Sequence, residues 1–202
     1  MNFEVQDMLR NTYNCIKKET TNPNKAWDTL IAFILANNNP YYLLQTYKEL
    51  TPILNKTKLQ QQLLSLYNNS LLRTDRYDHI GELYQNSNNY PLDKKLLSKQ
   101  EINWLTQKYV PETNKKISIL DPNARTGRLL IATKKRAPNA ILFGITKNVN
   151  EYRIALANAS IHKLPIYLIH VKPDALHSSH SMQINKHSWK HANQWHPFPQ
   201  KN

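Results

Sequence analysis

The chain has 202 residues, with 27 lysines and arginines against 14 aspartates and glutamates, and a formal net charge of +13. This length fits one domain, or one domain with a helical annex. A single cysteine, Cys15, excludes an internal disulfide framework. No apolar run approaches the roughly 20 residues of a membrane span. We therefore expect a cytoplasmic protein that does not bind membranes.

The excess of basic residues is typical of proteins that bind nucleic-acid phosphates. A chain rich in Asn, Lys, Ile and Tyr also suggests an AT-rich genome, which raises the lysine content for reasons unrelated to function. Such a bias would not by itself lower the number of acidic residues. Charge alone leaves both explanations open, with DNA as the candidate partner.

Residues 1–110 have the patterns of helices. Asn22-Pro23 and Asn39-Pro40 each place a capping residue before a proline that suits the first helical turn. Leucines at three- and four-residue spacing predict another helix over 57–72. Ser98 with Glu101 forms a capping box, which predicts a helix that begins at residue 99.

Residues 111–176 alternate between short apolar runs and helical patterns. Strands are expected at 117–120, 140–145 and 166–171, with helices at 128–136 and 149–162, the second capped by Asn148 with Glu151 as its capping-box partner. Gly127 and Gly144 are two of only three glycines, and we expect both to offer bare backbone to a ligand. A βαβαβ unit of this kind predicts an α/β fold with a parallel, Rossmann-like sheet that binds ligands at the carboxyl ends of its strands.

The stretches ILDPNARTGRLLIA, LFGITKN, EYRIALANASIHK and PDAL resemble the S-adenosylmethionine-binding half of the N6-adenine DNA methyltransferases. The modification subunits of type I restriction systems are the most similar group. The resemblance covers the middle and latter part of the chain and implies a truncated class I methyltransferase fold after a helical N-terminal region. By resemblance the cofactor site comprises Asp121, Pro122, Thr126, Gly127, Thr146 and Asp174.

Four positions depart from the family pattern. Arg125 stands where the family has the first loop glycine, and we expect its charge to crowd or repel the cationic sulfonium. Thr146 stands where the family has the acid that binds the ribose hydroxyls. Leu97 and Lys99 also replace an aromatic residue and a proline of the family, so the resemblance implies a weakened cofactor site.

The sequence Asn-Pro-Tyr-Tyr at 39–42 allows two interpretations. Amino-methyltransferases use Asn-Pro-Pro-Tyr to bind the target amine and to stack on a flipped base. Here the flanking residues have a helical period and Tyr41 replaces the second proline, so we interpret the stretch as a helix cap. No catalytic residue is assigned.

Residues 177–202 are rich in histidine and tryptophan, and we expect no pair of strands after Asp174. His187 and His191 have a spacing that can bind zinc on a helix, but no cysteine or acid accompanies them, so we interpret them as a polar surface and expect no metal. Trp189 and Trp195 are expected to pack the tail onto an open edge of the sheet. Alternatively, basic and aromatic residues here could stack on exposed bases.

Two functions follow from these patterns. The favoured hypothesis is a degenerate, non-catalytic methyltransferase-like protein, a pseudoenzyme that binds nucleic acid or a protein partner. The alternative is an active S-adenosylmethionine-dependent adenine methyltransferase of a restriction-modification system, or a subunit of a hetero-oligomer that supplies the catalytic residues. We predict three segments: helical 1–110, cofactor-binding 111–176 and the tail 177–202.

Overall fold

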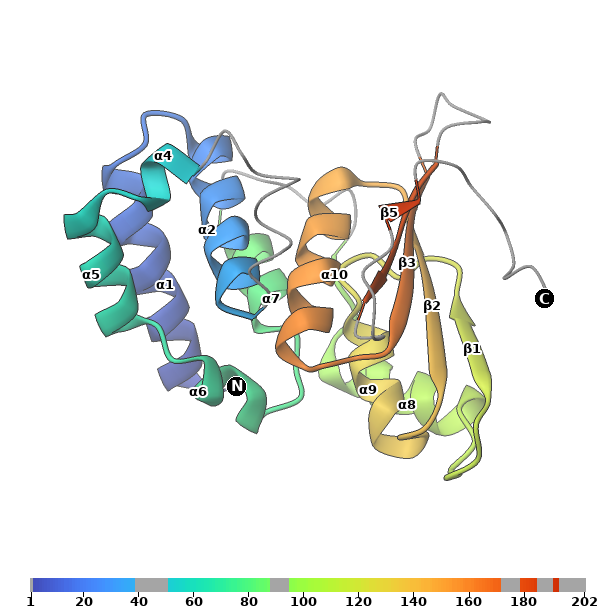
Figure 1. Ribbon diagram of the computed structural model, residues 1–202. Coiled ribbons are helices and arrows are strands. Elements are labelled where there is room, and N and C mark those ends of the chain that lie inside the picture. Colours follow the sequence, from blue (N-terminus) through green and yellow to red (C-terminus); the bar gives the residue numbers. More distant parts are fainter. Residues whose placement is uncertain (1, 39–50, 88–94, 172–178, 185–190, 193–202) are drawn as a thin grey trace. The chain divides into compact units, whose positions relative to one another are not determined.

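The computed structural model describes residues 2–38, 51–87 and 95–171, and the backbone of 179–184 and 191–192. The chain divides into two compact units, Met1–Leu96 and Leu97–Asn202. The first unit is helical and the second contains the sheet (Figure 1). Each unit has its own apolar core.

An aromatic cluster holds three helices of the first unit together. The indole of Trp27 stacks on Tyr13 with ring centroids 4.6 Å apart, and Tyr84 meets the same indole edge-on at 5.1 Å. These rings come from α2, α1 and α7, so the contacts join segments far apart in the sequence. The described helices of this unit are α1 (Phe3–Lys18), α2 (Pro23–Asn38), α4 (Thr51–Leu54), α5 (Thr57–Leu66), α6 (Asn69–Thr74) and α7 (His79–Asn86).

The helix predicted over 57–72 is instead two helices, α5 and α6, so that prediction was wrong. The chain is extended at Tyr67 and Asn68. The Asn68 side chain caps α6 by accepting hydrogen bonds from the backbone N–H groups of Ser70 and Leu71. This capping offers the backbone an alternative to a continuous helix. The prediction of a helix start at Asn22-Pro23 is confirmed, whereas Asn39-Pro40 and the rest of 39–50 lie outside the described residues.

Gly81 lies in the first turn of α7 for a steric reason. Its N–H donates to Asp78 Oδ1 at 2.7 Å, which caps the helix. A side chain at this position would overlap the Asp78 carboxylate. The third glycine of the chain therefore serves the helix cap.

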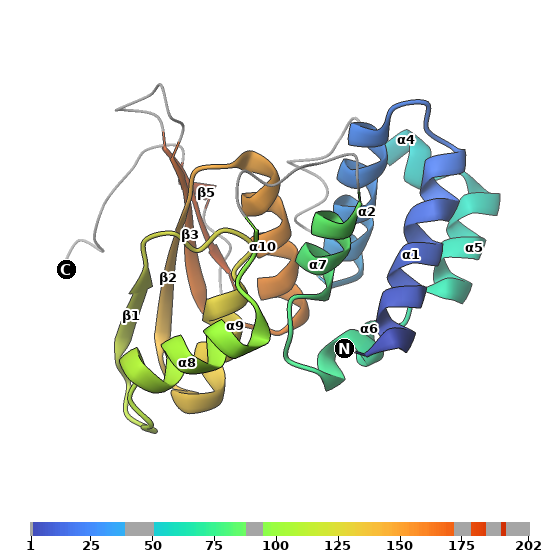
Figure 2. The same cartoon turned by 180° about the vertical axis from the view of Figure 1, so that it is seen from behind.

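The second unit has a Rossmann-like, methyltransferase-type arrangement, as predicted. It contains α8 (Lys99–Tyr109), β1 (Ser118–Asp121), α9 (Arg128–Arg136), β2 (Ile141–Thr146), α10 (Val149–Ile161) and β3 (Ile166–Val171). Strands β1, β2 and β3 are parallel and lie in sequence order, which places α9 and α10 on the same face of the sheet (Figure 2). Helix α8 packs on α9, and its predicted capping box is present.

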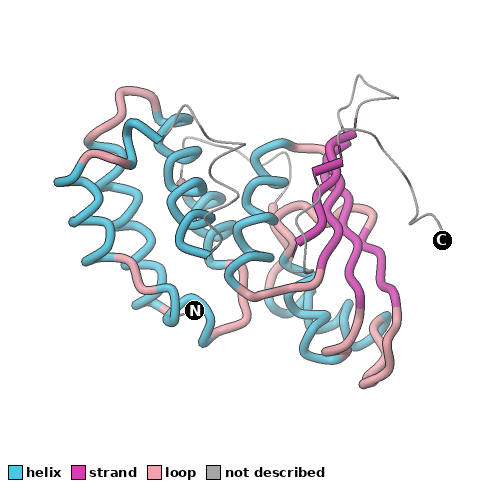
Figure 3. The backbone as a smooth tube through the Cα atoms, viewed as in Figure 1, coloured by secondary structure: helices cyan, strands magenta, loops and turns pink. Residues whose placement is uncertain are grey.

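Two further strands follow β3, contrary to our expectation that none would follow Asp174. Strand β4 (Ser179–Ile184) pairs antiparallel with β3, and β5 (His191–Ala192) pairs antiparallel with β4 (Figure 3). Polar residues fill the first half of β4, so its sequence lacks the apolar run that signals a strand. Hydrogen bonds to the exposed backbone edge of β3 stabilise β4 in spite of its polar sequence.

Among the described residues, no helix combines the length and the apolar character that crossing a bilayer requires. The side chains of the tail, including the histidines and tryptophans singled out above, lie outside the described residues.

Candidate cofactor-binding site

The predicted site residues gather at the carboxyl ends of β1 and β2. Asp121 is the last residue of β1, and the loop that follows it leads to Gly127 at the start of α9. Thr146 is the last residue of β2, the neighbouring parallel strand. The structure thus brings together Asp121, Pro122, Thr126, Gly127 and Thr146, whereas Asp174 lies outside the described residues.

Backbone hydrogen bonds fix the loop between β1 and α9. The N–H of Ala124 donates to Ile145 O at 2.8 Å, which ties the loop to β2, and the N–H of Gly127 donates to Ala124 O at 2.7 Å. Gly127 has a φ of 81°, in the left-handed region that glycine adopts without strain. Arg125 has a φ of 50°, which costs a residue with a side chain on the order of 1 kcal/mol. This loop is held in a strained conformation by its surroundings.

The Arg125 side chain turns toward α10. Its Nε and Nη2 donate to Glu151 Oε1 at 2.9 Å and 2.7 Å, and the two side chains are only 16% and 8% exposed. The Glu151 carboxylate therefore neutralises the guanidinium charge within the protein. This weakens the repulsion of a sulfonium that we expected from Arg125. The Asn148 cap is confirmed, because its side chain accepts from the amides of Asn150 and Glu151, but the Glu151 carboxylate binds Arg125 instead of completing a capping box.

Helix α10 also holds the loop through Asn158. The Asn158 Nδ2 donates to Thr126 O at 2.9 Å, and both residues are buried. Next to this bond, a Cβ added to Gly127 would lie 3.6 Å from Ala155 Cβ. The loop therefore packs directly on the face of α10. Sequence reasoning missed both α10 partners, Glu151 and Asn158, because each lies at least 26 residues from the loop residue that it contacts.

Thr146 is 1% exposed, and its hydroxyl has no hydrogen-bond partner within the described part of the chain. A buried hydroxyl offers one polar contact, whereas the family's acid offers a charged acceptor with two oxygens. Within the described part of the chain, the acid on the following helix, Glu151, does not replace it at the end of β2, since it is bound to Arg125. This end of the site does not fit the family's mode of ribose binding.

Asp121 has a perturbed pKa, as residues at ligand sites often do. Burial raises the pKa of this carboxyl, and a hydrogen bond from the N–H of Asn123 to its Oδ1, at 3.0 Å, lowers it in part. Burying a carboxylate costs folding free energy when its partners do not compensate fully. Such perturbed groups cluster at functional sites, which keeps Asp121 a candidate.

Gly144 has a different role from the one predicted. A Cβ at this position would lie 2.8 Å from Leu168 Cδ2, 2.9 Å from Leu130 Cδ1 and 3.0 Å from Ala124 Cβ. The bare backbone of Gly144 therefore faces side chains of the core, and our expectation that it faces a ligand was wrong. Glycine here allows α9 and the loop to approach the sheet closely.

The described residues contain no group of three or more His, Cys, Asp or Glu side chains that could hold a metal ion. His187 and the other histidines of the tail are outside that search.

The chain resembles a known protein in its fold. A solved structure from Listeria monocytogenes, described as a "putative class I S-adenosylmethionine-dependent methyltransferase", matches with a TM-score of 0.57 and 18% sequence identity. The match covers 87% of this chain and 55% of that chain, so the chain spans little more than half the length of that protein. No family model and no curated protein matches the sequence. The likeness supports the methyltransferase-like fold, while the adenine-specific subtype stays a prediction.

The first prediction concerns the ion pair. Replacing Glu151 with alanine should lower the free energy of unfolding by about 3 kcal/mol, because it removes the carboxylate that the Arg125 guanidinium, only 16% exposed, binds at 2.7 Å. Urea denaturation measures this loss. The matched control is Glu112→Ala in the same unit, since Glu112 is 81% exposed and lies 3.8 Å from Arg136, and its loss should stay below about 1 kcal/mol.

The double variant Arg125→Gly with Glu151→Ala should be more stable than Glu151→Ala alone. It removes both the unpaired charge and the left-handed conformation of Arg125. Equal, small losses for Glu151→Ala and Glu112→Ala would contradict a buried pair.

The second prediction concerns Asp121. Because the pKa of Asp121 is raised on folding, the folded state binds the proton more tightly than the unfolded state. Stability therefore falls as the pH rises from the ordinary pKa of the group, 3.8, through the raised pKa. Asp121→Asn removes this penalty, so the variant should be more stable than the wild type at pH 7 and should lose that advantage as the pH falls toward 4. Denaturation midpoints across this range test it. A variant less stable at pH 7 would show that the carboxylate is favourably bound.

Proposed function

We propose that this protein is a non-catalytic, nucleic-acid-binding module built on a methyltransferase-like fold. The observation that carries the proposal is the buried pair of Arg125 and Glu151. These side chains fasten the loop between β1 and α9 to helix α10, through contacts internal to the protein. This is the loop that the family uses for its cofactor.

The β2 end of the site supports the same proposal. Tight binding of S-adenosylmethionine by the family's pattern needs an acid for the ribose, and Thr146 supplies only a buried hydroxyl. A charged, two-point hydrogen bond contributes more than a neutral single bond. We therefore expect weak cofactor affinity at best.

The distribution of charge supports a nucleic-acid partner. Residues Leu97–Asn202 contain 16 lysines and arginines against 5 acids, a difference of +11, whereas Met1–Leu96 contains 11 against 9, a difference of +2. A codon bias that enriches lysine acts on both units alike, so it does not account for this asymmetry. A strongly basic unit attracts polyanions.

The alternative function is an active S-adenosylmethionine-dependent methyltransferase, or a subunit of one that receives its catalytic residues from a partner. The observation that favours it is Asp121, a carboxylate kept partly buried at the carboxyl end of β1 beside the left-handed Gly127. The Asn-Pro-Tyr-Tyr stretch that could serve catalysis lies outside the described residues.

Calorimetric titration of the full chain with S-adenosylmethionine separates the two functions. We expect no binding tighter than millimolar. The double variant Arg125→Gly with Glu151→Gln should also fail to bind S-adenosylmethionine. It removes the arginine side chain from the loop, but the end of β2 still has no acid. Micromolar binding by the wild type would overturn the non-catalytic proposal in favour of the alternative.

Binding to DNA at increasing salt tests the nucleic-acid part. The logarithm of the affinity should fall linearly with the logarithm of the salt concentration, by about 0.7 for each phosphate contacted on a single strand and about 0.9 on a duplex. Fluorescence anisotropy with labelled oligonucleotides measures both slopes. An affinity that stays constant between low and moderate salt would refute phosphate contact.

A further inference from the structure

Two large aromatic side chains of α8 are exposed, Trp104 in the middle of the helix and Tyr109 at its C-terminal end. Trp104 is 56% exposed and Tyr109 is 65% exposed, with ring centroids 6.3 Å apart and planes at 87°. The helix is anchored through other residues, since Ile102 and Thr106 are its buried members. More than half of the surface of each aromatic residue is therefore available to a ligand.

A lysine lies against both rings. The Lys108 Nζ is 4.6 Å from the centroid of the Trp104 ring and 5.1 Å from that of Tyr109. Such cation–π contacts keep a positive charge beside an exposed aromatic face. Aromatic rings that stack on bases and nearby cations that bind phosphates are the two elements of single-strand binding.

More basic residues lie on the segment that follows α8 and on the end of α9. The segment that follows α8 packs on the last turn of α9, where Arg136 Nε donates to Val110 O at 3.0 Å and Arg136 O accepts the Thr113 N–H at 3.0 Å. The segment with Lys115 and Lys116 therefore lies next to the last turn of α9, which contains Lys135. We call this region the corner.

Two acids lie on these same elements. Glu112 lies 3.8 Å from Arg136, and the Glu101 carboxylate accepts the Ser98 N–H at the opposite end of α8. Lys134 is buried, and its Nζ donates to the carbonyls of Pro138 and Ala140, so it serves the fold. Among the described side chains of this corner, the basic ones outnumber the acids.

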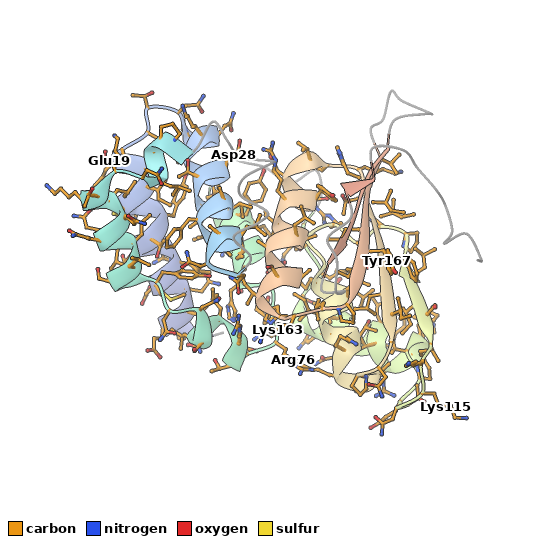
Figure 4. The ribbon with its side chains drawn as sticks, viewed as in Figure 1. Glu19, Asp28, Arg76, Lys115, Lys163 and Tyr167 are labelled. Carbon is orange, nitrogen blue, oxygen red and sulfur yellow. The ribbon has the colours of Figure 1, made fainter. Side chains whose placement is uncertain are left out.

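We propose that Trp104, Lys108 and Tyr109, together with Lys115, Lys116 and Lys135, form a binding surface for single-stranded nucleic acid. We call it the α8 surface. Figure 4 shows Lys115 in the loop before β1, at the amino ends of the strands. The candidate cofactor site lies at the carboxyl ends, so the α8 surface is separate from it. The inference rests on the nucleic-acid part of the proposed function and names the surface that carries it.

The chemistry of the surface selects a single strand over other partners. An exposed indole can stack on unpaired bases, whereas a duplex hides its base faces and offers mainly phosphates. A protein partner fits less well, because protein–protein interfaces are depleted in lysine. The α8 surface combines exposed aromatic faces with four lysines.

The test compares variants of the full chain for binding to a labelled single-stranded oligonucleotide and to a duplex of the same sequence. Trp104→Ala should weaken single-strand binding by about 5- to 150-fold, the range for loss of one stacked base, and should affect the duplex less. Trp104→Phe should restore most of the affinity. Phe3→Ala removes an aromatic residue that is 75% exposed in the other unit and should change nothing.

Lys108→Gln should reduce the salt slope for the single strand by about 0.7, the value for one phosphate contact. Circular dichroism should show unchanged melting for Trp104→Ala, because the side chain is exposed. The wild type could bind DNA with a clear salt slope while Trp104→Ala and Lys108→Gln bind with the same affinity and slope. In that case the assignment of binding to the α8 surface is wrong and the proposed function stands. If the wild type binds no nucleic acid at low salt, both are overturned.

Discussion

The parallel pairing of β1 with β2 is the constraint on which the second unit depends. It sets Asp121 opposite Gly144 and brings the loop after β1 against the end of β2, where Ala124 N–H donates to Ile145 O. Close approach is possible only because Gly144 has no side chain, since a Cβ there would meet Leu168, Leu130 and Ala124 at 3.0 Å or less. Gly144, which we expected to face a ligand, thus allows the helix to pack against the sheet.

The loop fixed in this way is stabilised from one side by α10. The Arg125–Glu151 pair and the bond from Asn158 to Thr126 O both cross from α10 to the loop. Removing charges from water is costly, so a buried pair gives little net stability, but it strongly resists the loss of either partner. Arg125 also adopts a left-handed conformation at an energetic cost. The pair therefore fixes the shape of the loop more than it adds stability, and it does so with contacts inside the protein.

The sequence was sufficient to predict the parallel strands and the helices between them, because apolar periodicity and caps such as Ser98 and Asn148 are local signals. The sequence was insufficient where a contact joins residues that are far apart in the chain. It was also insufficient where strand pairing forms a strand from residues too polar to predict one. The Arg125–Glu151 pair has no local signature, and β4 is too polar to be recognised before β3 offers it an edge. The break at Asn68 is a third kind of failure, since a side-chain cap competed with a leucine stripe that favoured one helix.

The two ends of the sheet differ in the way they treat charge. At the carboxyl ends, the charge of Arg125 is buried and balanced by Glu151, and the end of β2 carries a hydroxyl in place of an acid. At the other end, Lys108 lies over two exposed aromatic rings, and the other lysines of the α8 surface are exposed. Neutralised charge attracts few ligands, whereas exposed like charges raise the local concentration of polyanions. The unit has a difference of +11 between basic and acidic residues, and the α8 surface that we propose is where part of this excess charge is exposed beside aromatic rings.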